Sequence, residues 1–327
     1  MGFEAMPTMI ELDQLTKRFG AITAVDNVTM SVNTGEVLGF LGPNGAGKST
    51  TMKMVAGFLD PTSGRASVCG QDVSRDPVAV KRQLGYLPEG APTYGDMTPL
   101  SYLRFIAEIR GFDGAERQRR VDAVVEKVSL EEVLRQPIET LSKGFKRRVG
   151  LAQTMLHDPP VLIMDEPTDG LDPNQKRHVR ALIKEMSHDK AIVISTHILE
   201  EVEAVCSRAV IIARGKIRAD ARPDELRAQA TNHNAVLIVT TDADAAPIKS
   251  KIGAITGVTN IDVEQKSDSI VHLRVFPKKG QQIAQQINDL LRAEDLSTSE
   301  EFIEQGALDD VFWDMTAEEK QGGAGNA

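Results

Sequence analysis

Short apolar runs and longer segments with helical periodicity alternate along most of the chain. Four runs, at residues 37–41, 161–164, 191–194 and 209–212, are apolar at nearly every position instead of at every second one. Strands that are covered on both faces have this composition. This alternation predicts a parallel α/β sheet, whose ligand sites lie at the carboxyl ends of the strands. Helical patterns lie between or beside the runs, at residues 99–110, 116–128, 146–156, 174–187 and 199–205.

Weaker strand signals lie on either side of this region. Residues 10–15 and 28–32 are predicted strands with a turn region at 20–26. Residues 216–220 are predicted to form a last strand, and a short helix is predicted to begin at Pro223.

The pattern changes beyond about residue 230. Val271, Leu273 and Val275 recur at every second position, as in a strand, and Ile283 and Ile287 share one face of a predicted helix. The order strand, helix, strand, strand, helix, strand predicts a small α+β domain of the ferredoxin-like type. These elements and a closing helix are predicted at residues 235–240, 245–252, 258–264, 269–276, 279–292, 301–304 and 308–315.

The length of 327 residues exceeds the roughly 250 to 300 residues at which a single hydrophobic core stops growing. We therefore predict two domains, at residues 8–228 and 229–316. Residues 317–327, which end in a stretch rich in Gly and Ala, are predicted to form a disordered tail.

The composition excludes several classes of protein. No apolar run approaches the ~18 residues of a membrane span. The first residues lack the basic flank and apolar centre of a signal peptide, and Cys69 and Cys206 offer no disulfide framework. We therefore expect a protein of the reducing cytoplasm. A net charge of -9 argues against a general nucleic-acid binder, so we expect no nucleic-acid partner.

A glycine-rich loop between the strand at 37–41 and a helix at 51–56 is the strongest chemical signal. It matches a phosphate-binding loop, whose glycines allow backbone N–H groups to surround a phosphate at a helix N-terminus. We expect Lys48 to reach the β and γ phosphates of a nucleotide, and Ser49 to bind Mg²⁺. The predicted nucleotide-binding residues of the loop are Gly42, Pro43, Asn44, Gly45, Ala46, Gly47, Lys48, Ser49 and Thr50.

Two carboxylates follow the apolar run at 161–164, which puts them at the same sheet edge as the loop. We expect Asp165 to hold Mg²⁺, and Glu166 to accept a proton from an attacking water or to polarise it. Residues 195–197 end the next predicted strand, where a neutral His197 could donate a hydrogen bond to the γ phosphate. The plainer alternatives are a solvated acidic turn and a histidine that only packs.

In their order and spacing, these motifs resemble those of the ATPase subunits of ABC transporters, which implies a P-loop NTPase fold. The resemblance covers residues 10–226, nearly the whole first predicted domain. The matches are the Walker A loop at 42–50, the Walker B strand at 161–166, the signature at 141–145, the D-loop at 170–172, the switch histidine His197, and Phe19, which falls where the family stacks an aromatic ring on adenine.

The resemblance implies ATP, Mg²⁺ and a second copy of the chain. Family members hold two ATP molecules between head-to-tail subunits, each of which supplies its signature to the Walker A loop of the other. Ser142 as an N-cap, the N–H of Gly144 and the following helix dipole would form an anion site for the partner's ATP. We expect Arg147 and Arg148, on that helix, to form a solvated or ATP-facing surface and not a nucleic-acid patch.

The chain departs from the common family pattern at two motifs. Glu89 stands where most members have a glutamine that contacts Mg²⁺ and couples to the membrane partner, and we expect Glu89 to accept from Mg²⁺ or its water. Lys143 and Phe145 replace the glycine and glutamine of the common signature. Residues 87–89, this signature and the closing segment 307–316 resemble exporter subunits of the gliding-motility and drug or polysaccharide export group.

The resemblance therefore implies an ATPase that dimerises on ATP and drives export through a separate polytopic membrane permease, on the inner face of the cell membrane. It also assigns the choice of substrate to the permease. One alternative is the ATPase of an importer, such as a methionine importer, with the second domain as a ligand sensor. Another is an ABC ATPase of DNA repair or translation, but those usually carry two ATPase domains, a coiled-coil insertion or zinc-binding cysteines.

Overall fold

The computed structural model describes residues 7–90, 93–267, 270–294 and 298–317. These residues form two compact units, which divide between Pro223 and Asp224. The domain boundary predicted after residue 228 lies a few residues further along the chain. Each unit is described by itself below.

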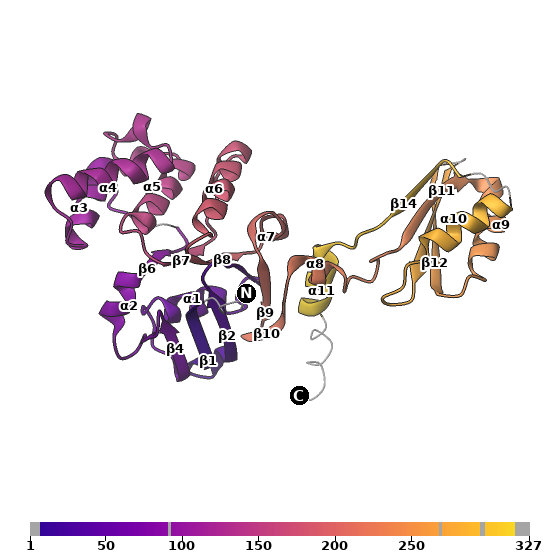
Figure 1. Cartoon of the computed structure of the whole chain (residues 1–327), viewed down its shortest axis with the longest axis horizontal. Coiled ribbons are helices and arrows are strands. Elements are labelled where there is room, and N and C mark those ends of the chain that lie inside the picture. Colours follow the sequence, from indigo (N-terminus) through magenta and orange to yellow (C-terminus); the bar gives the residue numbers. More distant parts are fainter. Residues whose placement is uncertain (1–6, 91–92, 268–269, 295–297, 318–327) are drawn as a thin grey trace, which may run out of the picture. The chain divides into compact units, whose positions relative to one another are not determined.

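The centre of the first unit is a six-stranded sheet (Figure 1). Its edge strand β10 (Lys216–Ala221) pairs with β9 (Arg208–Ala213) in the antiparallel sense, and all the other neighbours are parallel. The predicted parallel α/β sheet is therefore confirmed, with one antiparallel strand added. After β10 and β9, the order continues with β3 (Val37–Leu41), β8 (Ala191–Thr196), β7 (Val161–Asp165) and β6 (Leu84–Leu87).

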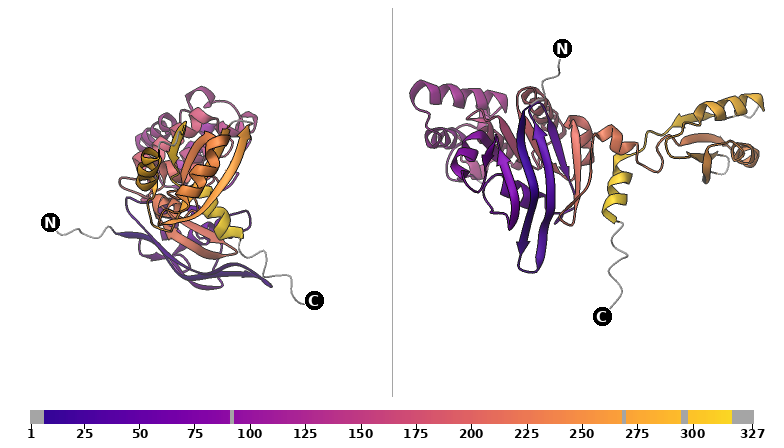
Figure 2. Two further views of the ribbon diagram at one scale, coloured as in Figure 1. Left: turned by 90° about the vertical axis from the view of Figure 1, so that its right-hand side faces the viewer. Right: turned by 60° about the horizontal axis from the view of Figure 1, so that its bottom comes forward.

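A second, antiparallel sheet contains two long strands, which lie side by side in the right-hand view of Figure 2. In sheet order its strands are β2 (Ile22–Asn33), β1 (Thr8–Phe19), β4 (Ser63–Val68) and β5 (Gln71–Asp72). The pairing of β1 with β2 continues to Phe19 and Ile22, so the predicted turn region at 20–26 is wrong beyond Ala21. Gly20, at φ +57°, allows this tight connection.

Three helices of the first unit, α3, α5 and α6, begin where a polar side chain accepts a hydrogen bond from an N–H group of the first turn. A capping box of Thr98 and Ser101 opens α3, and one of Asp172 and Gln175 opens α6. No helix among the described residues is both long and apolar enough to cross a membrane. The helices are α1 (Lys48–Val55), α2 (Pro77–Gln83), α3 (Pro99–Ile109), α4 (Gly114–Lys127), α5 (Lys143–Met155), α6 (Pro173–Met186) and α7 (Leu199–Val205), with 3-10 turns at Glu131–Val133 and Ile138–Thr140.

The apolar strands of the central sheet contribute to a core on each face. On β7, Leu162 and Met164 join a core built with α3 to α6, whereas Val161 and Ile163 join a core built with α1 and the antiparallel sheet. Figure 1 shows these two layers on opposite sides of the sheet. All positions of β7 and β8 are buried, which explains why both strands are apolar at consecutive positions up to their polar carboxyl ends instead of alternating.

The second unit contains an antiparallel sheet with two helices on one face. Val271, Leu273 and Val275 are buried against Ile248 and Ile287 of the helices, as their alternation predicted. The order of the first six elements is the predicted one, and the sheet order is that of a ferredoxin-like domain. In sheet order the strands are β12 (Val258–Ser267), β13 (Ile270–Pro277), β11 (Val236–Thr241) and β14 (Glu300–Ile303), and the helices are α9 (Asp242–Ile252) and α10 (Ala284–Ala293).

Three helix boundaries near the second unit differ from or extend the prediction. The first, α8 (Pro223–Arg227), begins at Pro223 as predicted and ends at Arg227. The predicted start of α10 at residue 279 is wrong, because Gly280 adopts φ +80° in a turn before the helix. The closing α11 (Leu308–Ala317) includes Ala317, a strong helix former, which was predicted to belong to the tail. The rest of the predicted disordered tail, 318–327, lies outside the described residues.

His157, which follows α5, makes the first unit sensitive to acid. Its Nε2 lies 3.2 Å from the carbonyl oxygen of Leu84, and its buried Nδ1 has no hydrogen-bond partner among the described residues. Burial, aided by the positive charge of Arg110, lowers the pKa of His157 from 6.5 to about 4. Below pH 6.5 the unfolded chain therefore binds a proton that the folded chain resists, and stability falls as the pH drops toward 4.

We expect the wild-type chain to lose about 1–2 kcal/mol more stability than His157→Gln between about pH 7.5 and about pH 5. Urea unfolding at the two pH values, followed by circular dichroism, measures this difference. His188→Gln, at an exposed histidine, is the matched control and should behave as wild type. An equal acid response of wild type and His157→Gln would contradict the assignment.

Candidate functional site

Segments from four strands bring predicted site residues to the carboxyl edge of the central sheet. The phosphate loop follows β3, Glu89 follows β6, Asp165 and Glu166 lie at the end of β7, and His197 follows β8. Because these strands are parallel, their carboxyl ends share one edge of the sheet. The topology therefore assembles these residues from positions that are distant in the sequence.

Close backbone packing shapes the phosphate loop. A Cβ atom at Gly42 would lie 2.4 Å from the carbonyl oxygen of Ile212, and one at Gly47 would lie 2.5 Å from that of Ala24. Gly47 also adopts φ +108°, a conformation that L side chains rarely adopt. Both positions therefore require glycine. Of the other loop residues, Pro43, Asn44 and Gly45 are exposed, Ala46 is buried, and Ser49 and Thr50 are half-buried in the first turn of α1.

Lys48, the first residue of α1, lies within the loop. It is 7% exposed, and its Nζ donates hydrogen bonds to two carbonyl oxygens of the loop, at 2.6 and 3.2 Å. Burial lowers the pKa of Lys48, and the negative charges of Glu166, Asp165 and Glu89 oppose this shift. The lysine and these carboxylates therefore share one electrostatic environment, as expected of a site for a phosphate and its metal ion.

Asp165 presents a buried oxygen atom that fits a metal ion. It is 2% exposed, its Oδ1 accepts a hydrogen bond from the hydroxyl of Ser195, and its Oδ2 has no partner among the described residues. Mg²⁺ prefers oxygen ligands and is usually bound by one or two carboxylates together with phosphate oxygens. Within the described chain, no three His, Cys, Asp or Glu side chains are arranged to hold a metal by themselves. Asp165 therefore fits an Mg²⁺ ion that is shared with a nucleotide, and Ser49 and Glu89 stay predicted ligands of that ion.

The predicted catalytic residues Glu166 and His197 are in direct contact. His197 Nδ1 lies 2.8 Å from Glu166 Oε1, and the hydroxyl of Thr196 lies 3.4 Å from Oε2. The side chain of Glu166 is 15% exposed and that of His197 is 59% exposed, so the pair is accessible from the histidine side. Glu166 also adopts φ +51°, an uncommon conformation for a residue with a side chain. Its N–H donates to the carbonyl oxygen of Ser195 at 2.9 Å.

The prediction of an exposed surface at Arg147 and Arg148 is wrong. The two residues are 5% and 9% exposed, because the face of α5 that carries them packs into the unit. Arg147 donates to backbone carbonyl oxygens at the candidate site, and Arg148 donates to those of Val128 and Ser129. Helical periodicity alone did not reveal this, because a buried arginine needs carbonyl partners that only the folded chain supplies.

The signature residues lie at the start of α5. The side chain of Ser142 accepts a hydrogen bond from the N–H of Phe145 at 3.3 Å, which confirms it as the N-cap. A Cβ atom at Gly144 would lie 2.7 Å from Gln175 Oε1 and 3.4 Å from Leu171, so this glycine packs closely on the predicted D-loop and α6. Ser142 opens onto a hollow of about 360 Å³ that is also lined by Phe145. The anion site predicted there is therefore accessible from outside the unit.

Phe19 lies at the end of β1 and is 49% exposed, with Lys17 Nζ 5.2 Å from its ring centroid. An exposed ring suits the predicted stacking on adenine. Among the described residues, no hydrogen bond or ion pair joins Phe19, Ser142 or Gly144 to the charged cluster around Lys48. The predicted site residues at the sheet edge therefore lie together around Lys48, whereas Phe19, Ser142 and Gly144 have no such link to this cluster.

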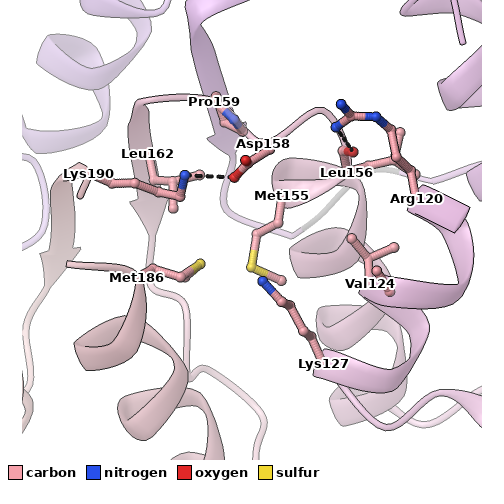
Figure 3. Close-up of a pocket in the computed structure, with 11 residues that line it drawn as sticks. Arg120, Val124, Lys127, Met155, Leu156, Asp158, Pro159, Leu162, Met186 and Lys190 are labelled. Carbon is pink, nitrogen blue, oxygen red and sulfur yellow. Dashed lines mark hydrogen bonds and ion pairs between the residues drawn. The ribbon is translucent and has the colours of Figure 1, made fainter. Parts of the chain in front are cut away.

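A separate hollow of about 230 Å³ lies at the amino ends of β7 and β8 (Figure 3). Lys190 Nζ donates to Asp158 at 2.7 Å, and Arg120 donates to the carbonyl oxygen of Leu156 at 3.4 Å. Because α4, α5 and α6 all end beside this hollow, such cations offset the partial negative charge of helix C-termini. No predicted site residue lines it.

Comparisons with known proteins agree with this geometry. A family model described as "ABC transporter" matches residues 25–169. The probable multidrug ABC transporter ATP-binding protein YbhF of Escherichia coli is 38% identical over 229 residues, which are 69% of this chain and 39% of YbhF. The linearmycin resistance ATP-binding protein LnrL of Bacillus subtilis is 36% identical over 210 residues, which are 64% of this chain and 68% of LnrL.

Solved structures show the same fold. One, titled as the structure of an ATP binding subunit of an ABC transporter, has a TM-score of 0.64 and 34% sequence identity. It covers 68% of this chain, and the match spans 93% of that structure. The fold is therefore that of the P-loop ABC cassettes, as the motifs predicted. Because the chain is 36% identical to LnrL over 68% of the length of that protein, it belongs to the ATP-binding subunits of the ABC transporter family.

Proposed function

We propose that the chain binds and hydrolyses ATP and thereby drives export through a separate polytopic membrane permease. The observation that carries this proposal is the union, at one sheet edge, of the phosphate loop, the buried Asp165 and the Glu166–His197 pair. Each belongs to the set of motifs that the ABC family shares, and together they provide both binding and chemistry.

The phosphate loop and Lys48 would hold the β and γ phosphates, and Phe19 would stack on the adenine ring. Ser49, Asp165 and Glu89 would hold Mg²⁺, directly or through water. When bound, the ion offsets negative charge on the phosphates. The orphaned Oδ2 of Asp165 supports this assignment, because a buried carboxylate oxygen without a partner is costly.

Glu166 would activate the attacking water by accepting its proton or polarising it. A neutral His197 has one ring N–H, so it would either hold the Glu166 carboxylate by donating from Nδ1 or donate from its other ring nitrogen to the γ phosphate, and only the imidazolium would do both. The side chain of Glu166 is mostly buried, so protein groups replace most of the water around its carboxylate.

A second copy of the chain would complete the site in a head-to-tail dimer. Ser142 and the N–H of Gly144 lie at the start of α5, beside an open hollow and apart from their own phosphate loop. A γ phosphate brought by a second copy would meet this helix N-terminus, where anions are favoured. The second unit, at residues 229–316 by the predicted boundaries, is proposed to stabilise this dimer.

Export is favoured over import by the motifs and by the names of the relatives. YbhF is named a probable multidrug transporter protein, and LnrL is named for resistance to an antibiotic. Glu89, Lys143 and Phe145 agree with the exporter group. The chain would act at the inner face of the cell membrane, where its permease would choose the substrate.

If the chain instead served a methionine importer, its second unit would bind the amino acid. We expect no binding of methionine to the full chain in isothermal calorimetry. A saturable binding signal would favour the importer alternative.

The Glu166→Gln variant should keep ATP binding and lose hydrolysis by roughly 100-fold or more, because it removes the proton acceptor. It should also accumulate as an ATP-bound dimer, which size-exclusion chromatography with light scattering detects. Glu185→Gln, at an exposed glutamate of α6, is the control and should turn over as wild type. Undiminished turnover by Glu166→Gln would refute the proposed role.

The Gly47→Ala variant should lower ATP affinity by about tenfold or more, equivalent to about 1.4 kcal/mol. The added Cβ would meet the carbonyl oxygen of Ala24 at 2.5 Å in a backbone conformation of φ +108°. Titration with a fluorescent ATP analogue measures the loss. Gly70→Ala, at φ +75° with no atom within 4 Å, is the matched control for the backbone cost and should bind as wild type.

A further inference from the structure

Arg147 lies on the helix whose N-terminus is proposed to meet the ATP of a second copy. It follows Ser142 by five positions on α5, little more than one helical turn at 3.6 residues per turn. A displacement of the helix start is therefore transmitted directly to Arg147. Arg147 is 5% exposed, so neighbouring protein groups and not solvent surround its side chain.

The guanidinium of Arg147 joins two backbone segments of the chain's own ATP site. It donates to the carbonyl oxygen of Pro88 at 2.9 Å, directly before Glu89, and to those of Asp165 and Glu166. One side chain thus links α5 to the segments after β6 and β7. The planar fork of arginine spreads its donors over two terminal nitrogen atoms that reach separate segments, whereas the three donors of lysine all leave one nitrogen atom.

Glu166 depends on this link more than its neighbours do. At φ +51° its backbone is in a region that costs free energy for a residue with a side chain, and the surroundings must hold it there. Its N–H donates to the carbonyl oxygen of Ser195, and its own carbonyl oxygen accepts from Arg147 and, at 3.1 Å, from the N–H of Asp169. Without the guanidinium, the N–H of Asp169 alone would hold this carbonyl oxygen, and the strained backbone that carries the carboxylate would be less firmly fixed.

We propose that Arg147 is a positioning residue that makes the placement of Glu166 and Glu89 depend on the position of the signature helix. This inference rests on the proposed function, in which Ser142 serves the partner's ATP and Glu166 serves the chain's own. Arg147 then couples the two ATP sites of the dimer. ATP at one site should therefore favour the binding of ATP at the other. Because linkage is reciprocal, the two effects should be equal.

Arg148 provides a matched comparison within the same helix. It is also buried, at 9% exposed, and it also donates to backbone carbonyl oxygens, those of Val128 and Ser129. Its guanidinium lies 4.2 Å from the ring centroid of Phe145. These partners tie α5 to the end of α4 and not to the ATP site. A loss that reflects only helix packing should therefore affect both arginines alike.

The test compares wild type, Arg147→Lys and Arg148→Lys as full chains. ATP turnover is measured over a range of ATP concentrations, and affinity is measured with a non-hydrolysable ATP analogue. We expect a Hill coefficient above about 1.5 for wild type and near ~1 for Arg147→Lys. We also expect kcat of Arg147→Lys to fall by roughly 10- to 100-fold while its analogue affinity stays within about threefold of wild type. Arg148→Lys should keep the wild-type Hill coefficient.

Three results would overturn the inference: a Hill coefficient of 1 in the wild type, unchanged cooperativity in Arg147→Lys, or an equal loss in both variants. If Arg147→Lys folds poorly by its urea midpoint, Arg147→Gln, a shorter donor without charge, is judged by the same criteria. The proposed function is tested separately, by whether the wild type hydrolyses ATP and whether Glu166→Gln forms an ATP-bound dimer. Arg147→Lys combined with Glu166→Gln should still form that dimer.

Discussion

The burial of the central parallel strands on both faces is the constraint on which the rest of the first unit depends. Each strand contributes alternate side chains to two separate cores. A shift of one residue in its pairing would move every side chain to the wrong core, so the register of the strand is fixed. The loops that leave its carboxyl edge therefore start from rigid points. This rigidity allows Lys48, Asp165 and Glu166, which are far apart in the sequence, to share one site.

The site that results concentrates charge where little water reaches it. Lys48 and Arg147 are almost fully buried beside Asp165, and both donate hydrogen bonds to carbonyl oxygens, although the Nε of Arg147 has no partner among the described residues. Burial lowers the pKa of both cations, and the nearby carboxylates oppose the shift. A nucleotide and its metal ion would complete this balance, since phosphates neutralise the lysine and Mg²⁺ neutralises the carboxylates.

Much of this arrangement could be predicted from sequence because its signals are local. The phosphate loop is contiguous, and Asp165, Glu166 and His197 directly follow apolar strands, so strand position implies site position. The sequence patterns predicted no element where the signal is weak or distant. β4 and β5 are short and largely exposed, β6 and α2 are short, and their existence depends on neighbours that they meet only in the fold. The strand order of the antiparallel sheet in the first unit, β2, β1, β4 and β5, likewise depends on pairing between distant segments.

The sequence by itself determined the fold class, the family motifs and the residue types that ATP chemistry needs. Only the tertiary structure decided that Arg147 is buried against the backbone of Pro88, Asp165 and Glu166, and that Glu166 adopts a strained conformation. A periodic pattern shows which face of a helix is polar, but it does not show whether that face meets solvent or buried carbonyl oxygens. Those partners exist only once distant strands have packed, so the difference between an exposed and a buried arginine is a property of the fold.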